Sequence, residues 1–424
     1  MNPLIARFGQ IVGNTIDRKP QKALALLKAA YKVSGWQMAY LPDKRLSPAH
    51  KYLAVICNQA IQQPLRQPQR SAVVNVFLPC HILQAMNILP QFTEGLACYL
   101  NGAGSERAFI EIAEINGTPK SYCSYHKILI GAALSNVLPK PRFVVNTTLA
   151  CDANISTFRL LAEHYDVPHF TIDIPNTNNE HNISYVASQL EEMTAFIEDI
   201  MQEKLDPDKL RESIRTHNRS IRLYHEYYKE LREKFLVSNL TSEMYNIFVT
   251  HILLGTPQAE RYFQLLLEDT KKAPKVQEQL RLLWLHTMPF WQESVKDIFN
   301  FSERYQLLCS DLNFDIFCEI PEDDPYYGMA RKLLNNAMGG TIERRAENAL
   351  KIAHNLQADG AIYFNHWGCK NTLGGAQFTK KLLQEAGVPT LVIDGDGCDR
   401  NNSNDGQIKT RVQAFLEMLE GKND

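Results

Sequence analysis

The stretch RFVVNTTLACDANISTFRLLAEHYDVPHFTIDIP, residues 142–175, decides the fold class. It begins with a β-branched apolar run at 142–148, continues with apolar residues at helical spacing over 154–167, and ends in a second apolar run at 169–175. Such runs are typical of parallel strands that are buried on both faces, and a strand, helix, strand order places the two strands in one sheet. We expect a right-handed crossover.

Further strand-like runs extend this pattern along the chain. They are AVVNVF at 72–77, RLLWLHT at 281–287, DIFCEI at 315–320, GAIYFN at 360–365 and TLVIDGD at 390–396. Helical periodicity dominates the N-terminal region and the charged amphipathic region between them. A chain of 424 residues also exceeds what one core usually serves. We therefore predict an α/β protein with four parts: a helical segment at 1–70, a first α/β domain at 71–180, a helical domain at 181–275 and a second α/β domain at 276–424.

The charge pattern excludes some classes of partner. Lys and Arg number 45 against 47 Asp and Glu, without a long block of one sign, so we expect no binding to nucleic acid or to a membrane surface. The N-terminal residues lack a secretory pattern, and no run of about 18 apolar residues suggests a membrane span. We expect a cytoplasmic protein whose nine cysteines are reduced.

Three cysteines lie where a parallel sheet places functional groups. Cys151 and Cys369 follow strand-like runs, and Cys123 precedes a helix-like segment in SYCSYHKILIG. Because the carboxyl ends of parallel strands form the functional edge, we expect these residues to meet between the two α/β domains. No Cys-x-x-Cys pair occurs, so spacing alone indicates neither a zinc ribbon nor a ferredoxin loop. Each thiol is open to two interpretations, a cluster ligand or a small buried apolar group.

The other six cysteines carry no such signal. Cys57, Cys309 and Cys318 have apolar neighbours and are expected to pack in the core. Roles for the remaining three, Cys80, Cys98 and Cys398, stay open.

Four blocks of sequence carry a wider resemblance. They are FLPCHILQAMNILP with EGLACYLNGAG and SYCSYHKILIG; TTLACDANISTFRLLAEHYDVPHFTIDIP; SYVASQLEEMTAFIEDIMQEKLDPDKLRESIRTHNRS; and HWGCKNTLGGAQFTKKLLQEAGVPTLVIDGDGCDRNNSNDGQIKTRVQAFLEML. Together these blocks resemble the family of 2-hydroxyacyl-CoA dehydratases and benzoyl-CoA reductases. The resemblance implies two flavodoxin-like parallel-sheet domains with an additional helical domain.

The resemblance also implies a cofactor and partners. Cys123, Cys151 and Cys369 match the three cysteines that hold a 4Fe-4S cluster in this family, leaving one iron open. A second homologous subunit, giving a heterodimer, and a separate ATP-dependent iron-sulfur activator are implied, with ATP used by that activator alone. The substrate would be an acyl-CoA.

The implied reaction removes water from an (R)-2-hydroxyacyl-CoA and gives a 2-enoyl-CoA. The hydrogen that leaves lies at the β carbon, which a thioester does not acidify, so ordinary acid-base catalysis is insufficient. The family injects one low-potential electron to form a ketyl radical that expels the hydroxyl group, and the electron is then recovered.

Three side chains are candidates for proton transfer. Glu94, in FTEGL, could supply a carboxylate, and His126 and His366 lie close in sequence to Cys123 and Cys369. For each of them a structural role is the alternative. Relatives often carry an acidic residue where this chain has Cys80 and His81 after a proline, which puts a substrate contact there in doubt.

Other functions remain open at this point. One is a subunit of a reductase related to benzoyl-CoA reductase or to proteins with a double-cubane cluster. Another is a subunit that relays electrons or supports its partner without binding substrate. A third is a zinc-binding or cluster-free scaffold, which would be colourless.

Overall fold

The computed structural model describes residues 3–16, 18–315 and 318–421. Three helices form its N-terminal part: α1 (Pro3–Ile16), α2 (Pro20–Tyr40) and α3 (Pro48–Arg66). Ser47 caps α3 by accepting the N–H of His50 at 3.3 Å, and a proline follows at the first helical position. The short helix η1 (Pro68–Arg70) leads from α3 into the first sheet.

The first sheet contains two strands from the stretch 142–175. Its strands are β1 (Ser71–Val74), β2 (Leu89–Phe92), β3 (Phe143–Thr147) and β4 (His169–Ile172). All pairs are parallel and the strand order is β2-β1-β3-β4, as in the first four strands of a flavodoxin-type sheet. Every residue of β3 is buried, as expected for a strand covered on both faces.

The second sheet repeats this plan. Its strands are β5 (Leu280–Leu285), β6 (Tyr305–Ser310), β7 (Gly360–His366) and β8 (Thr390–Gly395), all parallel, in the order β6-β5-β7-β8. The prediction of an α/β protein with two parallel sheets is therefore confirmed. The bounds predicted for the four parts stay predictions.

Two observed strands, β2 and β6, have no counterpart among the predicted runs. Both lie at a sheet edge, where a polar residue or a proline is tolerated, and Pro90 and Gln91 interrupt the apolar character of β2. Of the strand expected at 315–320, residues 316 and 317 lie outside the described residues, and residues 315 and 318–320 are not in a strand, so this prediction is wrong for the described part.

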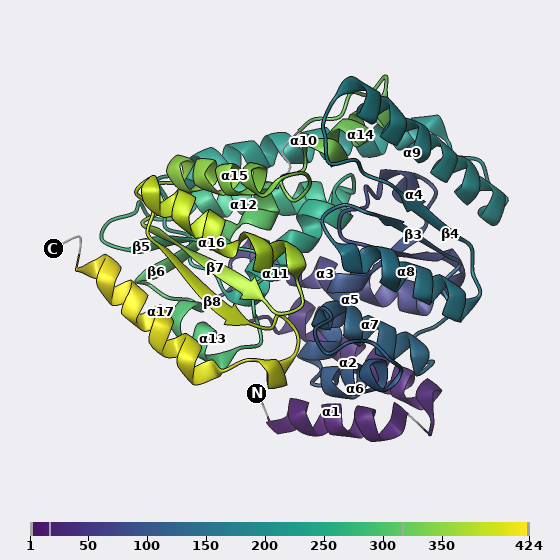
Figure 1. The fold of residues 1–424 in the computed structure, drawn as a ribbon, viewed down its shortest axis with the longest axis horizontal. Coiled ribbons are helices and arrows are strands. Elements are labelled where there is room, and N and C mark those ends of the chain that lie inside the picture. The colour runs from purple at the N-terminus through teal and green to yellow at the C-terminus, as the bar shows by residue number, and fades with distance from the viewer. Residues whose placement is uncertain (1–2, 17, 316–317, 422–424) are drawn as a thin grey trace.

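Helices cover both sheets and connect them (Figure 1). Around the first sheet lie α4 (His81–Ala85), α5 (Thr93–Gly102), α6 (Glu106–Ile115), α7 (Ser124–Leu134) and α8 (Asp152–Tyr165). The region between the sheets in sequence holds α9 (Glu180–Met201), α10 (Pro207–Leu231), α11 (Leu240–Phe248), a π-helical turn η2 (Val249–Leu253) and α12 (Pro257–Lys272). The second sheet is accompanied by α13 (Glu293–Phe299), η3 (Asp311–Phe314), α15 (Ile342–Asn355), α16 (Lys370–Glu385), η4 (Arg400–Asn402) and α17 (Asp405–Glu420). The helix α14 (Pro325–Asn335) packs against α9 instead (Figure 1).

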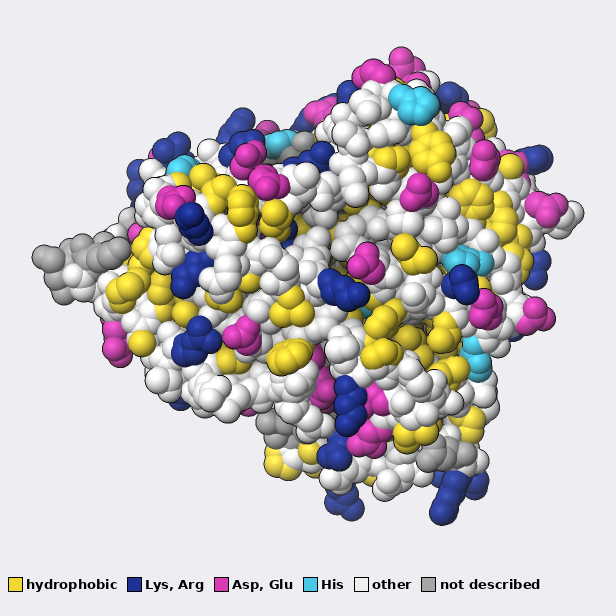
Figure 2. Space-filling model, viewed as in Figure 1, with side chains coloured by type: hydrophobic (Ala, Val, Ile, Leu, Met, Phe, Trp, Pro, Cys, Tyr) yellow, Lys and Arg dark blue, Asp and Glu magenta, His cyan; other side chains and the backbone are white. Residues whose placement is uncertain are grey.

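The surface matches the balanced composition. Figure 2 shows Lys and Arg side chains interspersed with Asp and Glu on the visible face, without a large region of one sign. None of the helices in the described residues combines the length and the apolar character that crossing a membrane requires.

Candidate functional site

Three cysteines stand at the N-termini of three helices and line one cavity. Cys123 is the N-cap residue of α7, Cys151 of α8 and Cys369 of α16. All three contribute to a cavity of about 600 Å³ that residues of both α/β domains line. Backbone N–H groups and the helix dipole at such positions favour a thiolate over a thiol. This placement agrees with the prediction that the three cysteines meet between the two α/β domains. Their role as cluster ligands stays a prediction.

Each thiol faces the Nε2 atom of a different histidine. The Sγ–Nε2 distances are 3.4 Å for Cys123 and His366, 3.7 Å for Cys151 and His126, and 3.3 Å for Cys369 and His286. These three pairs, Cys123–His366, Cys151–His126 and Cys369–His286, are called the thiol–imidazole pairs below.

In two of these pairs, the backbone contacts of the histidine identify the imidazole as the hydrogen-bond donor. The backbone N–H of Gly397 donates to His366 Nδ1 at 3.0 Å, and that of Thr287 donates to His286 Nδ1 at 2.6 Å. An Nδ1 atom that accepts a hydrogen bond carries no proton, so in each neutral ring the proton lies on Nε2 and points to sulfur. Burial lowers the pKa of both rings, which keeps them neutral. The predicted proton-donor role of His366 is untested, and its N–H is directed to Cys123.

The thiols are close enough to influence one another. Burial raises the pKa of Cys123 well above its usual range, and Cys151 and Cys369 raise it further because three thiolates would repel. Burial raises the pKa of Cys151 to about 12, with Cys369 as the second cause. A group that supplies positive charge among the three sulfurs would relieve both effects.

The three thiols are donors of the kind that hold an iron-sulfur cluster. Within the described ranges, no three His, Cys, Asp or Glu side chains converge closely enough to hold one metal ion. Three thiolates around a 4Fe-4S cluster bind different irons, so they need not approach one another as closely. The donor set, three cysteines with N–H groups aimed at two of the sulfurs, therefore fits such a cluster.

A buried arginine completes this side of the cavity. Arg345 is 4% exposed; its Nε donates to Asp311 Oδ2 at 3.0 Å and its Nη1 to Asn371 Oδ1 at 2.7 Å. Nη2 is buried and has no hydrogen-bond acceptor among the residues that the structure describes. Burial lowers the pKa of Arg345, but Asp311, Tyr363 and Cys369 together raise it above its usual value. A free, buried guanidinium N–H next to a cysteine fits a site built for electron-rich sulfur.

Glu94 lines the same cavity from the first turn of α5. Its Oε2 accepts the backbone N–H of Val76 at 3.2 Å. Burial raises its pKa to about 7, while backbone N–H groups and the nearby His251 oppose the rise. The structure thus places the carboxylate predicted for proton transfer beside the three cysteines.

The other predicted cysteines lie elsewhere. Cys80 and His81 are buried and are absent from the described lining of the cysteine cavity, and His81 Nε2 lies 3.1 Å from His217 Nδ1. Cys57 and Cys309 are buried as expected, and Cys318 is partly exposed.

Sequence reasoning missed His286, Arg345 and His251, which all line the cavity. His286 immediately follows β5, so the strand-end rule that selected Cys369 would have found it. Arg345 lies within α15 and His251 within η2, and no local pattern marks either residue.

Comparisons with known proteins show the family of this chain. The family model of the 2-hydroxyglutaryl-CoA dehydratase D-component matches residues 75–419. The chain is 24% identical over 370 residues to the (R)-phenyllactyl-CoA dehydratase alpha subunit of Clostridium sporogenes, covering 82% of this chain and 88% of the relative.

Two further relatives carry similar names. The (R)-2-hydroxyisocaproyl-CoA dehydratase alpha subunit of Clostridioides difficile is 22% identical over 366 residues, covering 81% of this chain and 88% of the relative. The (R)-2-hydroxyglutaryl-CoA dehydratase subunit alpha of Acidaminococcus fermentans is 24% identical over 309 residues, covering 68% and 62% respectively.

Proposed function

Because the chain belongs to the 2-hydroxyglutaryl-CoA dehydratase D-component family and its relatives are dehydratases, which are hydro-lyases, we propose that it is the iron-sulfur subunit of a 2-hydroxyacyl-CoA dehydratase. It would convert an (R)-2-hydroxyacyl-CoA to a 2-enoyl-CoA through a ketyl radical. The observation that carries this proposal is the convergence on one cavity of Glu94 and three cysteines at helix N-cap positions.

The chain's own residues would hold a 4Fe-4S cluster. Cys123, Cys151 and Cys369 would bind three irons, and the N–H groups of His366 and His286 would donate to the ligand sulfurs. When bound, such a cluster supplies a low-potential electron and one open iron that acts as a Lewis acid toward a substrate oxygen.

Glu94 would accept the β proton of the substrate. A general base works best when its pKa lies near the working pH, and burial raises the pKa of Glu94 to about 7. The hydrogen bond from Val76 N fixes one carboxylate oxygen and so orients the group.

The active enzyme would need partners. The relatives are named as alpha subunits, which supports assembly with a second subunit; we propose a homologous one in a heterodimer. A separate ATP-dependent iron-sulfur activator would deliver the priming electron.

The test is strictly anaerobic purification, followed by iron, sulfide and visible absorption measurements on wild type, Cys151→Ala and Cys57→Ala. Cys57 is 1% exposed and lies outside the described cavity lining, so its variant is the control for losing a buried thiol. We expect about four irons per chain with broad visible absorbance in wild type and in Cys57→Ala, and loss of both in Cys151→Ala.

Two outcomes would contradict the proposal. About eight irons per chain would indicate the double-cubane reductase alternative. A wild-type protein that stays colourless after reconstitution with iron and sulfide would show that the three cysteines hold no cluster.

A further inference from the structure

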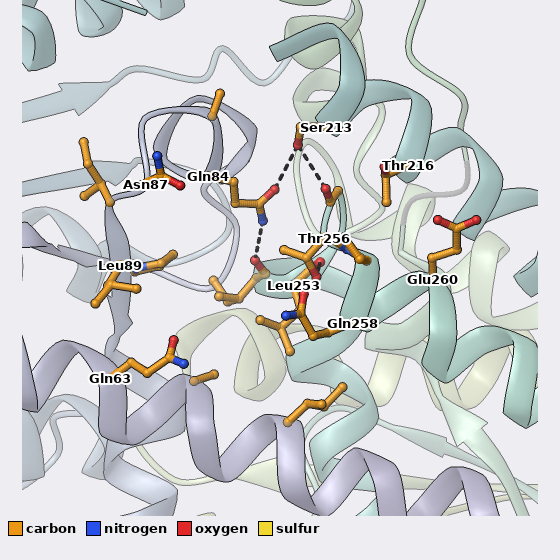
Figure 3. A pocket seen from close by; sticks show the side chains of 18 of the residues that line it. Gln63, Gln84, Asn87, Leu89, Ser213, Thr216, Leu253, Thr256, Gln258 and Glu260 are labelled. Atoms are coloured by element: carbon orange, nitrogen blue, oxygen red, sulfur yellow. Dashed lines mark hydrogen bonds between the residues drawn. The ribbon is translucent and has the colours of Figure 1, made fainter. Parts of the chain in front are cut away.

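The cysteine cavity contains a charged hydrogen-bond donor that has no acceptor. By contrast, the polar side chains of a second cavity, of about 650 Å³, are satisfied: Ser213 Oγ donates to Gln84 Oε1 at 3.0 Å, and Gln84 Nε2 donates to the carbonyl of Leu254 at 2.9 Å (Figure 3). None of the described residues lining this second cavity has a buried side-chain N or O atom without a partner. Four described residues of the cysteine cavity have one: Tyr125, His126, Thr287 and Arg345. Of these four groups, only the guanidinium of Arg345 carries a permanent positive charge.

Two hydrogen bonds hold this guanidinium in one orientation. Nε of Arg345 donates to Asp311 Oδ2 at 3.0 Å, and Nη1 donates to Asn371 Oδ1 at 2.7 Å. The ring of Tyr363 lies with its centroid 5.7 Å from Cζ. Because the guanidinium is planar and its N–H groups form a rigid fork, these contacts also fix the direction of Nη2. A buried N–H without an acceptor is unfavourable, so we expect an acceptor among the groups that the cavity binds.

Both hydrogen bonds lead to Cys369. Asn371 lies in the first turn of α16, the helix whose N-cap residue is Cys369. Asp311 Oδ1 accepts the backbone N–H of His286 at 2.6 Å. His286 Nε2 in turn lies 3.3 Å from Cys369 Sγ, in one of the thiol–imidazole pairs. The guanidinium of Arg345 therefore stands at the corner of the cavity that Cys369 occupies.

The carboxylate of Asp311 limits what Arg345 contributes electrostatically. Asp311 is buried with Arg345 as an ion pair, so the net charge of the two side chains is close to zero. The free Nη2–H remains as a dipole with a fixed direction. Hydrogen bonds to sulfur are among the features that set the reduction potential of an iron-sulfur cluster. They favour the reduced form, because its sulfurs carry more negative charge, and so they raise the potential.

We propose that Arg345 Nη2 donates a hydrogen bond to a sulfur of the bound cluster at the Cys369 corner, and that this bond raises the reduction potential of the cluster. The inference rests on the proposed iron-sulfur function and deepens it. A higher potential makes the cluster easier to reduce by an activator. An oxygen atom of the substrate is the other acceptor to consider, and a potential measured without substrate separates the two.

The test is a reductive titration of the anaerobic, cluster-loaded protein with low-potential mediators and no substrate, followed by visible absorbance. Wild type is compared with Arg345→Lys. The lysine ammonium reaches only the place of the guanidinium carbon, so the variant keeps a positive charge beside Asp311 and has no atom at the place of Nη2. At a fixed solution potential we expect the ratio of reduced to oxidised cluster to fall about tenfold in Arg345→Lys, a shift of about 59 mV to lower potential for one electron.

Arg281→Lys is the matched control. Arg281 is 3% exposed in β5, and its guanidinium donates to the carbonyls of Leu231, Arg232 and Leu356. It is absent from the described lining of the cysteine cavity, so its replacement removes buried hydrogen bonds and should leave the potential unchanged.

Three results would count against the inference in different ways. A cluster-loaded Arg345→Lys protein with the wild-type potential overturns it, even if turnover falls, because the acceptor of Nη2 would then belong to the substrate. Equal shifts in Arg345→Lys and Arg281→Lys overturn it as well, since they would reflect a general loosening of the fold. A wild-type protein without iron contradicts the proposed function itself, and with it the basis of the inference.

A measurement on the wild type covers the case in which Arg345→Lys binds no cluster. Protein carrying arginine labelled with ¹⁵N in the guanidinium group is loaded, reduced and studied by pulsed electron paramagnetic resonance. Arg345 is the only arginine among the described lining residues. We expect a weak nitrogen coupling to the reduced cluster that changes on labelling. A spectrum that labelling leaves unchanged overturns the inference.

Discussion

We expect ionisation of Glu94 to raise kcat/KM and to lower the stability of the folded protein. If Glu94 accepts the β proton, it must be ionised, and its pKa is about 7. The ionised fraction of such a group rises from about 9% at pH 6 to about 91% at pH 8. We therefore expect kcat/KM of the assembled enzyme to rise about tenfold over this interval.

Glu94→Gln removes the proton acceptor while keeping the size of the side chain. We expect kcat/KM to fall by about 10² to 10⁴ and the pH step to disappear. Glu94→Asp is the control, since it retains a carboxylate and should keep the step at a reduced rate. A Glu94→Gln enzyme with the wild-type rate and pH step would show that another group accepts the proton.

The same variant has a predictable effect on unfolding. Burial raises the pKa of Glu94 from 4.5 to about 7, so the folded protein holds this proton more tightly than the unfolded chain. The resulting stability is present below about pH 4.5 and is lost as the pH rises through 7, a loss of about 3 kcal/mol. The glutamine cannot ionise, so the Glu94→Gln variant does not lose this stability as the pH rises.

Anaerobic thermal unfolding of both proteins at pH 5.5 and pH 8 measures this difference. The melting temperature of Glu94→Gln, relative to wild type, should be higher at pH 8 than at pH 5.5. Parallel changes in the two proteins would refute the buried, titrating carboxylate.

Two further predictions concern the cluster site. Gly368 has φ +77°, and a Cβ there would lie 2.7 Å from Cys123 N. We therefore expect Gly368→Ala to separate the loops that carry Cys123 and Cys369 and to lower the iron content. Gly374→Ala is the control, because a Cβ there meets nothing within 4 Å, and it should retain the wild-type iron content. Arg345→Gln leaves Asp311 buried without its cation, so we expect unfolding to become easier by about 3 to 5 kcal/mol, measured by anaerobic denaturation. Arg345→Lys should recover part of this loss, and unchanged stability of the Gln variant would contradict a buried ion pair.

Most of the strands that the sequence predicts lie in short runs dominated by apolar and β-branched residues. The run at 142–148 contains β3, every residue of which is buried, and the runs at 281–287, 360–365 and 390–396 find β5, β7 and β8. The edge strand β2 escapes because Pro90 and Gln91 interrupt its apolar character. The pattern of β6, YQLLCS, is similar to that of the predicted strand β5, LRLLWL, and gives no reason of this kind. The composition of a short segment does not reveal whether it joins a sheet as its edge strand.

The site residues also fall into those that the sequence can reveal and those that it cannot. Cys151 could be selected because it follows a strand, and the same rule holds for Cys369 and His286. Arg345 and His251 could not, because no local pattern marks either residue. The functional role of these residues depends on the cavity that they line. Packing between segments distant in sequence determines which cavity that is.

The charge balance of the site explains why these distant residues are needed. A helix N-terminus stabilises a nearby anion by about 0.3 to 2 kcal/mol, whereas burying a charge costs several kcal/mol. Three helix N-termini therefore cannot offset three thiolates at Cys123, Cys151 and Cys369, of which the first is buried and the other two are partly exposed. Neutral imidazole N–H groups add hydrogen bonds without charge, and Arg345 adds one positive charge that Asp311 largely neutralises. With nothing bound, the raised pKa values of Cys123 and Cys151 favour the neutral thiols. The iron of the proposed cluster would supply the positive charge that ligating thiolates need.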